Sequence, residues 1–227
     1  MAASNAASLD GIGLLAPLSP AERKALGTRC AWRRYRTGEC ILRQDARCRH
    51  ILFVIEGVVS VVNYAESGRK IVYATMAAGC HVGELAAVDG EPRSASVEAV
   101  GDCLVAALPG AVLDELLVTH GQVAMVLLKD LARKVRRADE RIAERNVLGA
   151  APRVYRELQR LGRPCREGML IKPLPTQETL AALADTTRET AARAMSRLVK
   201  SGAACRRGRE LIIRDGTLLE TLITAEA

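Results

Sequence analysis

The pattern of hydrophobic and polar positions divides the chain into three parts, and the first part has the pattern of β-strands. From Cys30 to Leu108, short β-branched and apolar segments such as Ile51–Ile55 alternate with turn residues. Glycines punctuate these segments at intervals of 11 residues or, once, of 19: Gly38, Gly57, Gly68, Gly79, Gly90 and Gly101. Regular turn signals between short strands are typical of an antiparallel sandwich or barrel. We therefore expect a β domain over residues 14–110, which includes a short helix that begins at Ser19-Pro20.

The second part, from Ala111 to Asn146, has a helical period. Two series of apolar residues recur every seven positions and together form one stripe: Leu117, Ala124, Leu128, Leu131, Val135, Ala138 and Ile142. Apolar residues at the a and d positions of about three heptads are typical of a coiled-coil seam. We predict a dimerisation helix over residues 111–146 that pairs with a second copy of the chain, followed by a hinge at Asn146–Gly149. The alternative is that the stripe packs on the β domain.

The third part, residues 150–220, has the pattern of short helices followed by a β-hairpin. Two helical segments, Gln177–Ala184 and Arg188–Ser201, are separated only by Asp185-Thr186-Thr187. A tight link of this length between two short helices is the helix-turn-helix pattern. The residues that follow, Ala203–Ile213, predict a small β-hairpin.

The positive charge of the chain is concentrated in this third part. The whole chain has 33 Lys and Arg against 26 Asp and Glu, a net charge of +7, and between Ala150 and Arg214 there are 14 against 6. A basic region on an otherwise neutral chain indicates a polyanionic partner for that region. Aromatic residues make up only 3%, which argues against modules that stack single-stranded bases on aromatic side chains.

Composition also excludes other classes of protein. Hydrophobic residues make up 49% of the chain, enough for a core. No apolar run approaches the roughly 18 residues of a membrane helix, and Met1–Leu15 lacks the basic start of a secretory signal, so we expect a cytoplasmic protein with no membrane partner. The seven cysteines contain no C-x-x-C pair, so we expect neither a disulfide framework nor a metal. Because the chain has no nucleophile elbow, H-E-x-x-H motif or Walker loop, we do not expect an enzyme.

Two nearby motifs carry candidate chemistry: Gly83-Glu84-Leu85-Ala86 and Pro92-Arg93-Ser94-Ala95-Ser96-Val97. The stretch Val82–Glu98 that contains them resembles the phosphate-binding cassette of cyclic-nucleotide-binding domains. From Leu14 to Leu219 the chain resembles the CRP/FNR superfamily of bacterial transcription regulators, named for the cyclic AMP receptor protein and the fumarate-nitrate regulator. The resemblance implies an α+β fold: an N-terminal jelly-roll-like β-roll, a long coiled-coil dimerisation helix and a C-terminal winged helix-turn-helix. It also implies a homodimer that responds to a cyclic nucleotide, cAMP or cGMP, and binds a palindromic operator in double-stranded DNA, with RNA polymerase as a further partner.

The residues of these motifs suit a cyclic phosphodiester, which carries one negative charge and two free oxygens. The guanidinium of Arg93 can hold both oxygens with two parallel N–H donors, and Ser94 adds a hydroxyl donor. Backbone N–H groups beside Gly83 can approach the phosphate because glycine lacks a side chain. The resemblance assigns the Glu84 carboxylate to the ribose 2′-hydroxyl, whereas the alternative is a plain surface ion pair between Glu84 and Arg93. The predicted nucleotide-binding residues are Gly83, Glu84, Leu85, Arg93, Ser94, Ala95, Ala138 and Asp139.

The last two of these residues depart from the family pattern. The cyclic AMP receptor holds adenine with two adjacent hydroxyl residues on its long helix, and Ala138 and Asp139 occupy the matching positions here. The side chain of Ala138 cannot form a hydrogen bond. Asp139 can accept from the amino group of adenine, and it suits guanine better because the N1–H and amino groups of guanine match two carboxylate oxygens. The alternative is that Asp139 faces solvent, so the identity of the base stays open.

The segment Thr187–Arg193 begins the second helix of the helix-turn-helix, with Thr186 or Thr187 as its N-cap. Its R-E-T-x-x-R sequence resembles the DNA-reading helix of the cyclic AMP receptor, which implies that Arg188, Glu189 and Arg193 read bases in the major groove. The alternative for Glu189 is a helix cap. The residues expected to face inward are Ala191, Ala194, Met195 and Leu198, and the predicted DNA-binding residues are Thr187, Arg188, Glu189, Arg193, Gln177, Lys200 and Arg207.

The main alternative function is a regulator on the same scaffold with a different effector. One such effector is haem or another redox group bound through Cys80-His81, although adjacent residues of a strand point to opposite faces. Another is a different nucleotide. A regulator that needs no effector is the third alternative.

Overall fold

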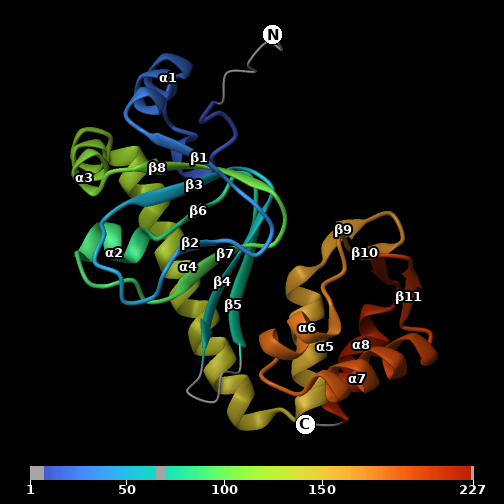
Figure 1. The fold of residues 1–227 in the computed structure, drawn as a ribbon. Coiled ribbons are helices and arrows are strands. Elements are labelled where there is room, and N and C mark those ends of the chain that lie inside the picture. The colour runs from blue at the N-terminus through green and yellow to red at the C-terminus, as the bar shows by residue number, and fades with distance from the viewer. Residues whose placement is uncertain (1–7, 65–69, 226–227) are drawn as a thin grey trace. The chain divides into compact units, whose positions relative to one another are not determined.

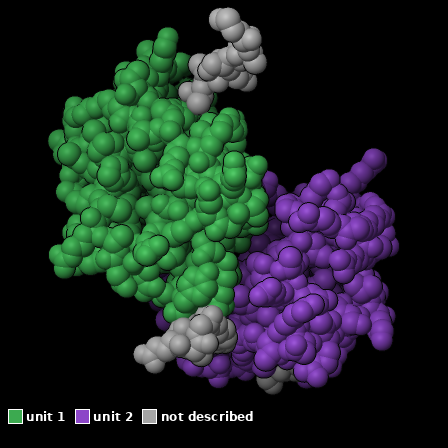
Figure 2. Space-filling model, in the orientation of Figure 1, with its two compact units in different colours: residues 1–134 green, residues 135–227 purple. Residues whose placement is uncertain are grey.

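The computed structural model describes residues 8–64 and 70–225, and Figure 1 shows the order of its helices and strands. The chain divides into two compact units, residues 1–134 and 135–227, which Figure 2 shows in different colours. Helix α4 (Gly121–Val147) begins in the first unit and ends in the second. Gly68, one of the predicted turn glycines, lies outside the described residues.

The first unit contains two antiparallel four-stranded sheets, which confirms the predicted β domain. One sheet has the order β1-β8-β3-β6 and the other β2-β7-β4-β5. Their strands are β1 (Ala31–Tyr35), β2 (Cys40–Leu42), β3 (Ile51–Glu56), β4 (Val58–Tyr64), β5 (Lys70–Ala77), β6 (His81–Val82), β7 (Ser96–Ala99) and β8 (Cys103–Leu108). Side chains alternate along β3: Leu52 and Val54 pack in a core with residues of the second sheet, whereas Ile51 and Phe53 pack against helices. The two sheets thus form a β-roll with helices on one outer face.

Helices of that outer layer are α1 (Pro20–Thr28), α2 (Glu84–Asp89), α3 (Gly110–Thr119) and the start of α4. Helix α1 begins with the predicted capping box, in which Ser19 and Glu22 each accept from the backbone N–H of the other. A short 3₁₀ turn, η1 (Gly13–Leu15), precedes it and buries Leu14 and Leu15 in the same core.

Helices α3 and α4 are separate, which corrects the prediction of one helix over residues 111–146. The chain bends by 111° between them, and His120 at the bend has non-helical dihedral angles (φ −122°, ψ 75°). Gly121 follows, and a glycine costs a helix interior about 1 kcal/mol relative to alanine. Leu117 therefore belongs to α3, and the other residues of the predicted stripe lie on α4. Neither α3 nor α4, nor any other single helix in the described ranges, is long and apolar enough to cross a membrane.

The second unit contains a helix-turn-helix and a small antiparallel sheet of order β11-β12-β10-β9. Its elements are α5 (Ala150–Leu161), β9 (Arg163–Cys165), β10 (Gly168–Ile171), α6 (Gln177–Leu183), α7 (Arg188–Lys200), β11 (Ala204–Arg207), β12 (Glu210–Ile213) and α8 (Gly216–Thr224). Tyr155 of α5 packs with Leu180 of α6 and Leu198 of α7 in one core. The helix-turn-helix and the β11–β12 hairpin confirm predicted elements, whereas the sequence pattern does not predict β9, β10 and α8.

Candidate functional site

The loop before β7 holds the side chain of Arg93 inside the first unit. Arg93 is only 2% exposed. Its Nη1 donates to the carbonyl of Gly83 at 2.7 Å, its Nη2 to the carbonyl of His50 at 2.5 Å and its Nε to Sγ of Cys48 at 3.3 Å. A guanidinium has five N–H groups, so two of them, one on each terminal nitrogen, have no hydrogen-bond partner among the described residues. The backbone thus anchors Arg93 while two donors remain for an anion.

Gly83 makes this anchoring possible. Its φ is +80°, in the left-handed region that glycine adopts without a steric cost. A Cβ at this position would lie 2.6 Å from Nη1 of Arg93 and 3.1 Å from Cδ1 of Leu42. The backbone conformation therefore favours glycine, and a side chain here would displace the guanidinium of Arg93 from its present position.

Glu84, the first residue of α2 (Glu84–Asp89), is a buried member of a partly exposed cluster of ionisable side chains. It is 6% exposed, and Nζ of Lys134 on α4 donates to its Oε1 at 2.8 Å. The same Nζ lies 3.2 Å from Oδ2 of Asp130. Burial opposes the charge of Lys134, but Glu84 and Asp130 outweigh burial and raise the pKa of Lys134 above its ordinary value. Within the part of the chain that the structure describes, Glu84 therefore pairs with Lys134 rather than with Arg93.

His81 lies in the same cluster, with Nε2 3.4 Å from Oδ2 of Asp130. Burial, followed by the charge of Lys134, lowers the pKa of His81 against the opposing pull of Glu84 and Asp130. The imidazole is therefore neutral at neutral pH. Its neighbour Cys80, the other residue of the alternative iron pair, is half-buried, and the described residues contain no group of three or more His, Cys, Asp or Glu side chains that could hold a metal ion.

The structure thus brings Gly83, Glu84 and Arg93 together. Of the other predicted nucleotide-binding residues, Leu85 is 46% exposed, Ser94 is exposed and Ala95 is half-buried. Ala138 and Asp139 are exposed on the part of α4 that belongs to the second unit, and their contact with a ligand stays a prediction.

Sequence reasoning does not find Lys134 as the partner of Glu84. Lys134 lies among many charged residues on α4, and the only local signal is its i, i+4 spacing from Asp130. Its pairing with Glu84 joins residues 50 positions apart. The fold, rather than a local pattern, creates this contact.

The second candidate site is the exposed face of α7. Thr187 is its N-cap, and the Thr187 hydroxyl accepts from the backbone N–H of Thr190 at 3.2 Å. The exposed residues at the start of α7 include Arg188, Glu189 and Arg193. The opposite face of α7 is buried, which confirms the residues predicted to face inward: Ala191, Ala194, Met195 and Leu198. Hydrogen bonds from its own backbone N–H and from Thr187 lower the pKa of Glu189, so this carboxylate is ionised at neutral pH.

The remaining predicted DNA contacts lie at the ends of three elements. Gln177 is the first residue of α6, Lys200 is the last residue of α7, and Arg207 ends β11. Arg207 forms a two-pronged pair with Glu167, with Nη1–Oε1 and Nη2–Oε2 distances of 3.1 Å. Glu167 therefore competes with any phosphate for the guanidinium of Arg207.

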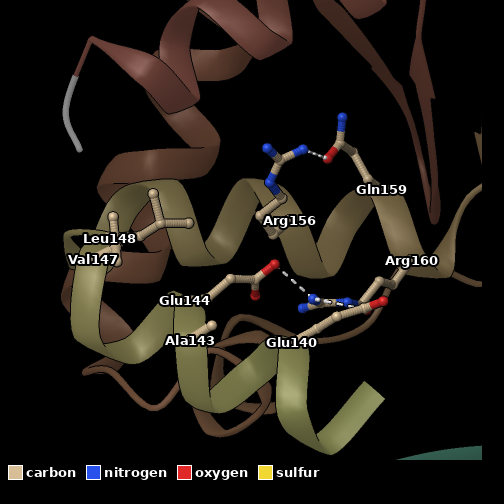
Figure 3. Close-up of a pocket in the computed structure, with 8 residues that line it drawn as sticks. All are labelled: Glu140, Ala143, Glu144, Val147, Leu148, Arg156, Gln159 and Arg160. Carbon is tan, nitrogen blue, oxygen red and sulfur yellow. Dashed lines mark hydrogen bonds and ion pairs between the residues drawn. The ribbon is translucent and has the colours of Figure 1, made fainter. Parts of the chain in front are cut away.

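A groove of about 560 Å³ in the second unit lies outside both candidate sites (Figure 3). It lies between the end of α4 and α5, and its lining is Glu140, Ala143, Glu144, Val147, Leu148, Arg156, Gln159 and Arg160. Figure 3 shows Arg160 directed toward Glu144, at 2.7 Å, and Arg156 toward Gln159, at 2.9 Å. The contact of Arg160 with Glu144 joins the α5 wall of the groove to the α4 wall, whereas Arg156 and Gln159 both belong to α5.

Comparison with known protein families identifies the two domains in which the candidate sites lie. Residues 32–120 match the cyclic nucleotide-binding domain, and residues 152–222 match the Crp-like helix-turn-helix domain. The chain belongs to the CRP/FNR superfamily of DNA-binding transcription regulators, as the sequence resemblance predicted.

Three similar proteins illustrate the range of this superfamily. The cAMP-activated global transcriptional regulator Vfr of Pseudomonas aeruginosa is 26% identical over 196 residues, which cover 81% of this chain and 89% of Vfr. The catabolite activator protein of Thermus thermophilus is 29% identical with a TM-score of 0.54, over 94% of this chain and 99% of that one. The c-di-GMP responsive regulator CLP of Xanthomonas campestris shares the fold at 20% identity, with a TM-score of 0.70 over 88% of this chain and all (100%) of CLP. Similar proteins are thus named for different nucleotide effectors.

Gly83→Ala is expected to weaken cyclic-nucleotide binding at least tenfold, because the new Cβ displaces the guanidinium of Arg93. The matched control is Gly90→Ala. Gly90 has a similar φ of +77°, but its Cβ would meet only the Arg49 side chain, at 3.9 Å. Both variants incur the left-handed backbone cost of roughly 1–2 kcal/mol. Calorimetric titration with cyclic nucleotide should therefore show weaker binding by Gly83→Ala than by Gly90→Ala. Equal nucleotide affinities of the two variants would contradict the role of Gly83.

Proposed function

We propose that this protein is a cyclic-nucleotide-responsive, dimeric transcription regulator that binds palindromic double-stranded DNA. The observation that carries the proposal is the anchored Arg93, whose two remaining N–H donors match the two free oxygens of a cyclic phosphodiester. Glu84 accepts from the ribose 2′-hydroxyl, which then shares the carboxylate with Lys134. Ser94 is exposed beside Arg93 and supplies a further donor to the phosphate.

Exposed apolar residues on α4 support a homodimer. Leu128 is 57% exposed, and Val135 and Ile142 are each 60% exposed, at a spacing of seven residues. Leu131, by contrast, packs against the core of the first unit. The dimer seam therefore centres on Leu128, Val135 and Ile142, whose side chains lie on one face of the helix.

The exposed face of α7 is the DNA-reading surface in this proposal. Arg188 donates to O6 and N7 of guanine, Glu189 accepts from the amino group of cytosine, and Arg193 extends this surface by one turn. Gln177, Lys200 and Arg207 contact phosphates. The protein then acts in the cytoplasm, recruits or contacts RNA polymerase, and has no catalytic role or metal requirement.

A same-fold regulator whose effector is a guanine nucleotide rather than cAMP is the second candidate function. The observation that favours it is Ala138, whose side chain offers no hydrogen bond to a base. The carboxylate of Asp139 suits guanine better than adenine.

Asp139 is therefore expected to make the protein prefer cGMP over cAMP, and Asp139→Ala should remove that preference. Calorimetric titrations of both nucleotides with both proteins test this. The variant should lose roughly tenfold in cGMP affinity, equivalent to about 1.4 kcal/mol, with little change for cAMP. An unchanged cGMP affinity would show that Asp139 faces solvent.

A further inference from the structure

Arg153 of α5 joins the end of α4 to the turn of the helix-turn-helix. Its Nη1 donates to the carbonyl of Leu148, the residue after α4, at 2.9 Å. Its Nε donates to the carbonyl of Ala184 at 2.9 Å, and its Nη2 to the carbonyl of Asp185 at 3.0 Å. One guanidinium therefore binds the backbone on both sides, so the two backbone segments are held together.

A second arginine reaches the same turn from α4 itself. Arg145, in the last turn of α4, forms an ion pair with the carboxylate of Asp185. Asp185 has a φ of +48°, a left-handed conformation that among residues with a side chain is best tolerated by Asn and Asp. Thr187, the N-cap of α7, follows two residues later. The ion pair thus connects the long helix to the turn that precedes the recognition helix.

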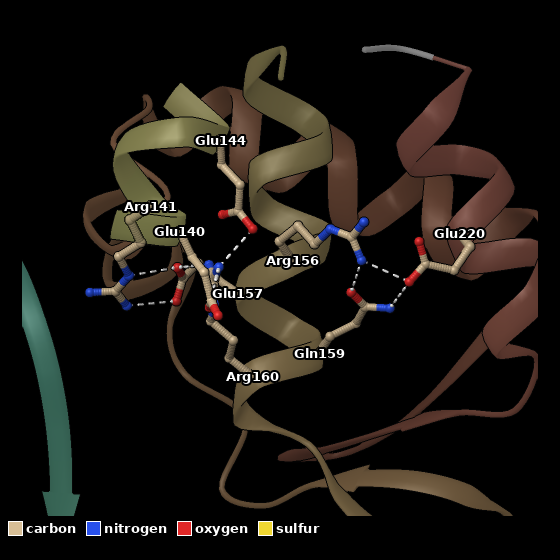
Figure 4. Close-up of polar contacts among 8 residues, drawn as sticks. All are labelled: Glu140, Arg141, Glu144, Arg156, Glu157, Gln159, Arg160 and Glu220. Carbon is tan, nitrogen blue, oxygen red and sulfur yellow. Dashed lines mark hydrogen bonds and ion pairs between the residues drawn. The ribbon is translucent and has the colours of Figure 1, made fainter. Parts of the chain in front are cut away.

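The end of α4 is also fixed to α5 by a buried carboxylate (Figure 4). Glu157 is 4% exposed and accepts from Arg141 at 3.0 Å and from Arg160 at 2.7 Å. Arg160 in turn donates to Glu144 at 2.7 Å. Breaking a buried pair leaves an uncompensated charge, so these contacts resist separation. This cluster joins the end of α4 to α5 across the predicted hinge at Asn146–Gly149.

We propose that Arg145 is a positioning residue, which through Asp185 transmits the position of the end of α4 to the recognition helix α7. The proposal rests on the proposed function and deepens it, because it names a contact of α4 with the turn, in addition to the hydrogen bonds of Arg153, through which α4 alters operator affinity. Arg145 is 58% and Asp185 28% exposed, and exposed pairs contribute little to stability. The Arg145–Asp185 pair therefore contributes to the placement of the turn rather than to the stability of the domain.

The test compares Arg145→Gln, Asp185→Asn and the double variant in the full-length protein. Asn keeps the left-handed turn accessible and removes only the charge. The probe is a labelled operator, selected from random duplex DNA with the wild-type protein, and its affinity is measured by fluorescence anisotropy with and without saturating cAMP or cGMP. The ratio of the two affinities, typically about 5- to 150-fold for coupled sites, should fall toward one in each single variant. The double variant should fall no further, because both changes remove one contact.

Arg156→Gln is the matched control. Arg156 lies on α5. It pairs with Gln159 at 2.9 Å and with Glu220 of α8 at 2.7 Å, and neither partner belongs to the turn (Figure 4). This variant should keep the wild-type ratio, and all variants should keep the wild-type melting temperature and affinity for non-specific DNA.

The outcomes separate this proposal from the function on which it rests. A wild-type ratio above one that survives Arg145→Gln, or that Arg156→Gln lowers equally, overturns the role of Arg145 alone. A wild-type ratio of one with both nucleotides overturns the proposed function, and the role of Arg145 with it.

Discussion

Replacing Arg93 by alanine is expected to abolish measurable binding of a cyclic nucleotide. The phosphate would lose a buried cationic partner that donates two hydrogen bonds, and truncating such a partner costs about 2–5 kcal/mol, or roughly 30- to 5,000-fold in affinity. Calorimetric titration with cAMP and with cGMP measures this loss directly.

The same substitution should also destabilise the first unit, so unfolding must be measured alongside binding. Arg93 donates to the carbonyls of Gly83 and His50, and a hydrogen bond from a charged group contributes about 1.5–3 kcal/mol. Arg49→Ala is the control, because Nη2 of Arg49 donates to the carbonyl of Ala87 at 2.8 Å without touching Arg93 or Gly83. Arg49→Ala should lower the melting temperature and keep nucleotide affinity. Wild-type affinity in Arg93→Ala would mean that the nucleotide site lies elsewhere.

Replacing Val135 by lysine is expected to produce a monomer that no longer binds a palindromic operator tightly. In a parallel two-fold seam, residue 135 of one copy meets residue 135 of the other, so the substitution places two ammonium groups against each other. Juxtaposed like charges cost several kcal/mol, which should weaken the dimer on the order of 100-fold or more. Light scattering gives the oligomeric state, and anisotropy with the operator gives the consequence for DNA.

Val118→Lys is the matched control for Val135→Lys, since it makes the same chemical change at another exposed valine. Val118 is 85% exposed on α3, outside the stripe on α4. This variant should remain a dimer and keep its operator affinity. A dimer that persists in Val135→Lys would contradict the α4 seam.

Local patterns made much of the fold predictable. The capping box of Ser19 and Glu22 and the inward face of α7 depend on residues three or four positions apart, so sequence spacing alone reveals them. The bend at His120 was not predictable in this way, because Leu117 and Ala124 keep a seven-residue spacing across the break. Strands β9 and β10 contain three and four residues, and they are stabilised by pairing of β10 with β12 and of β9 with β10 rather than by a hydrophobic alternation.

In the candidate site, too, the residues that are close in sequence were predictable and the contacts between distant residues were not. Gly83, Glu84 and Arg93 belong to a short motif, so the sequence alone was enough to name them together as a candidate site. The anchors of Arg93 on Cys48 and His50, and the Lys134 partner of Glu84, join segments 43 or more residues apart. These contacts follow from strand pairing and helix packing, which a single sequence does not display.

The most direct test of a ligand-gated regulator is one titration of operator DNA with the wild-type protein. A palindromic operator, with half-sites about 34 Å apart, is titrated without nucleotide, with saturating cAMP and with saturating cGMP. At least one nucleotide should raise operator affinity, by roughly 5- to 150-fold, and by linkage the operator should raise affinity for that nucleotide by the same factor. Operator affinity that stays unchanged with both nucleotides would contradict gating by a cyclic nucleotide bound at Arg93.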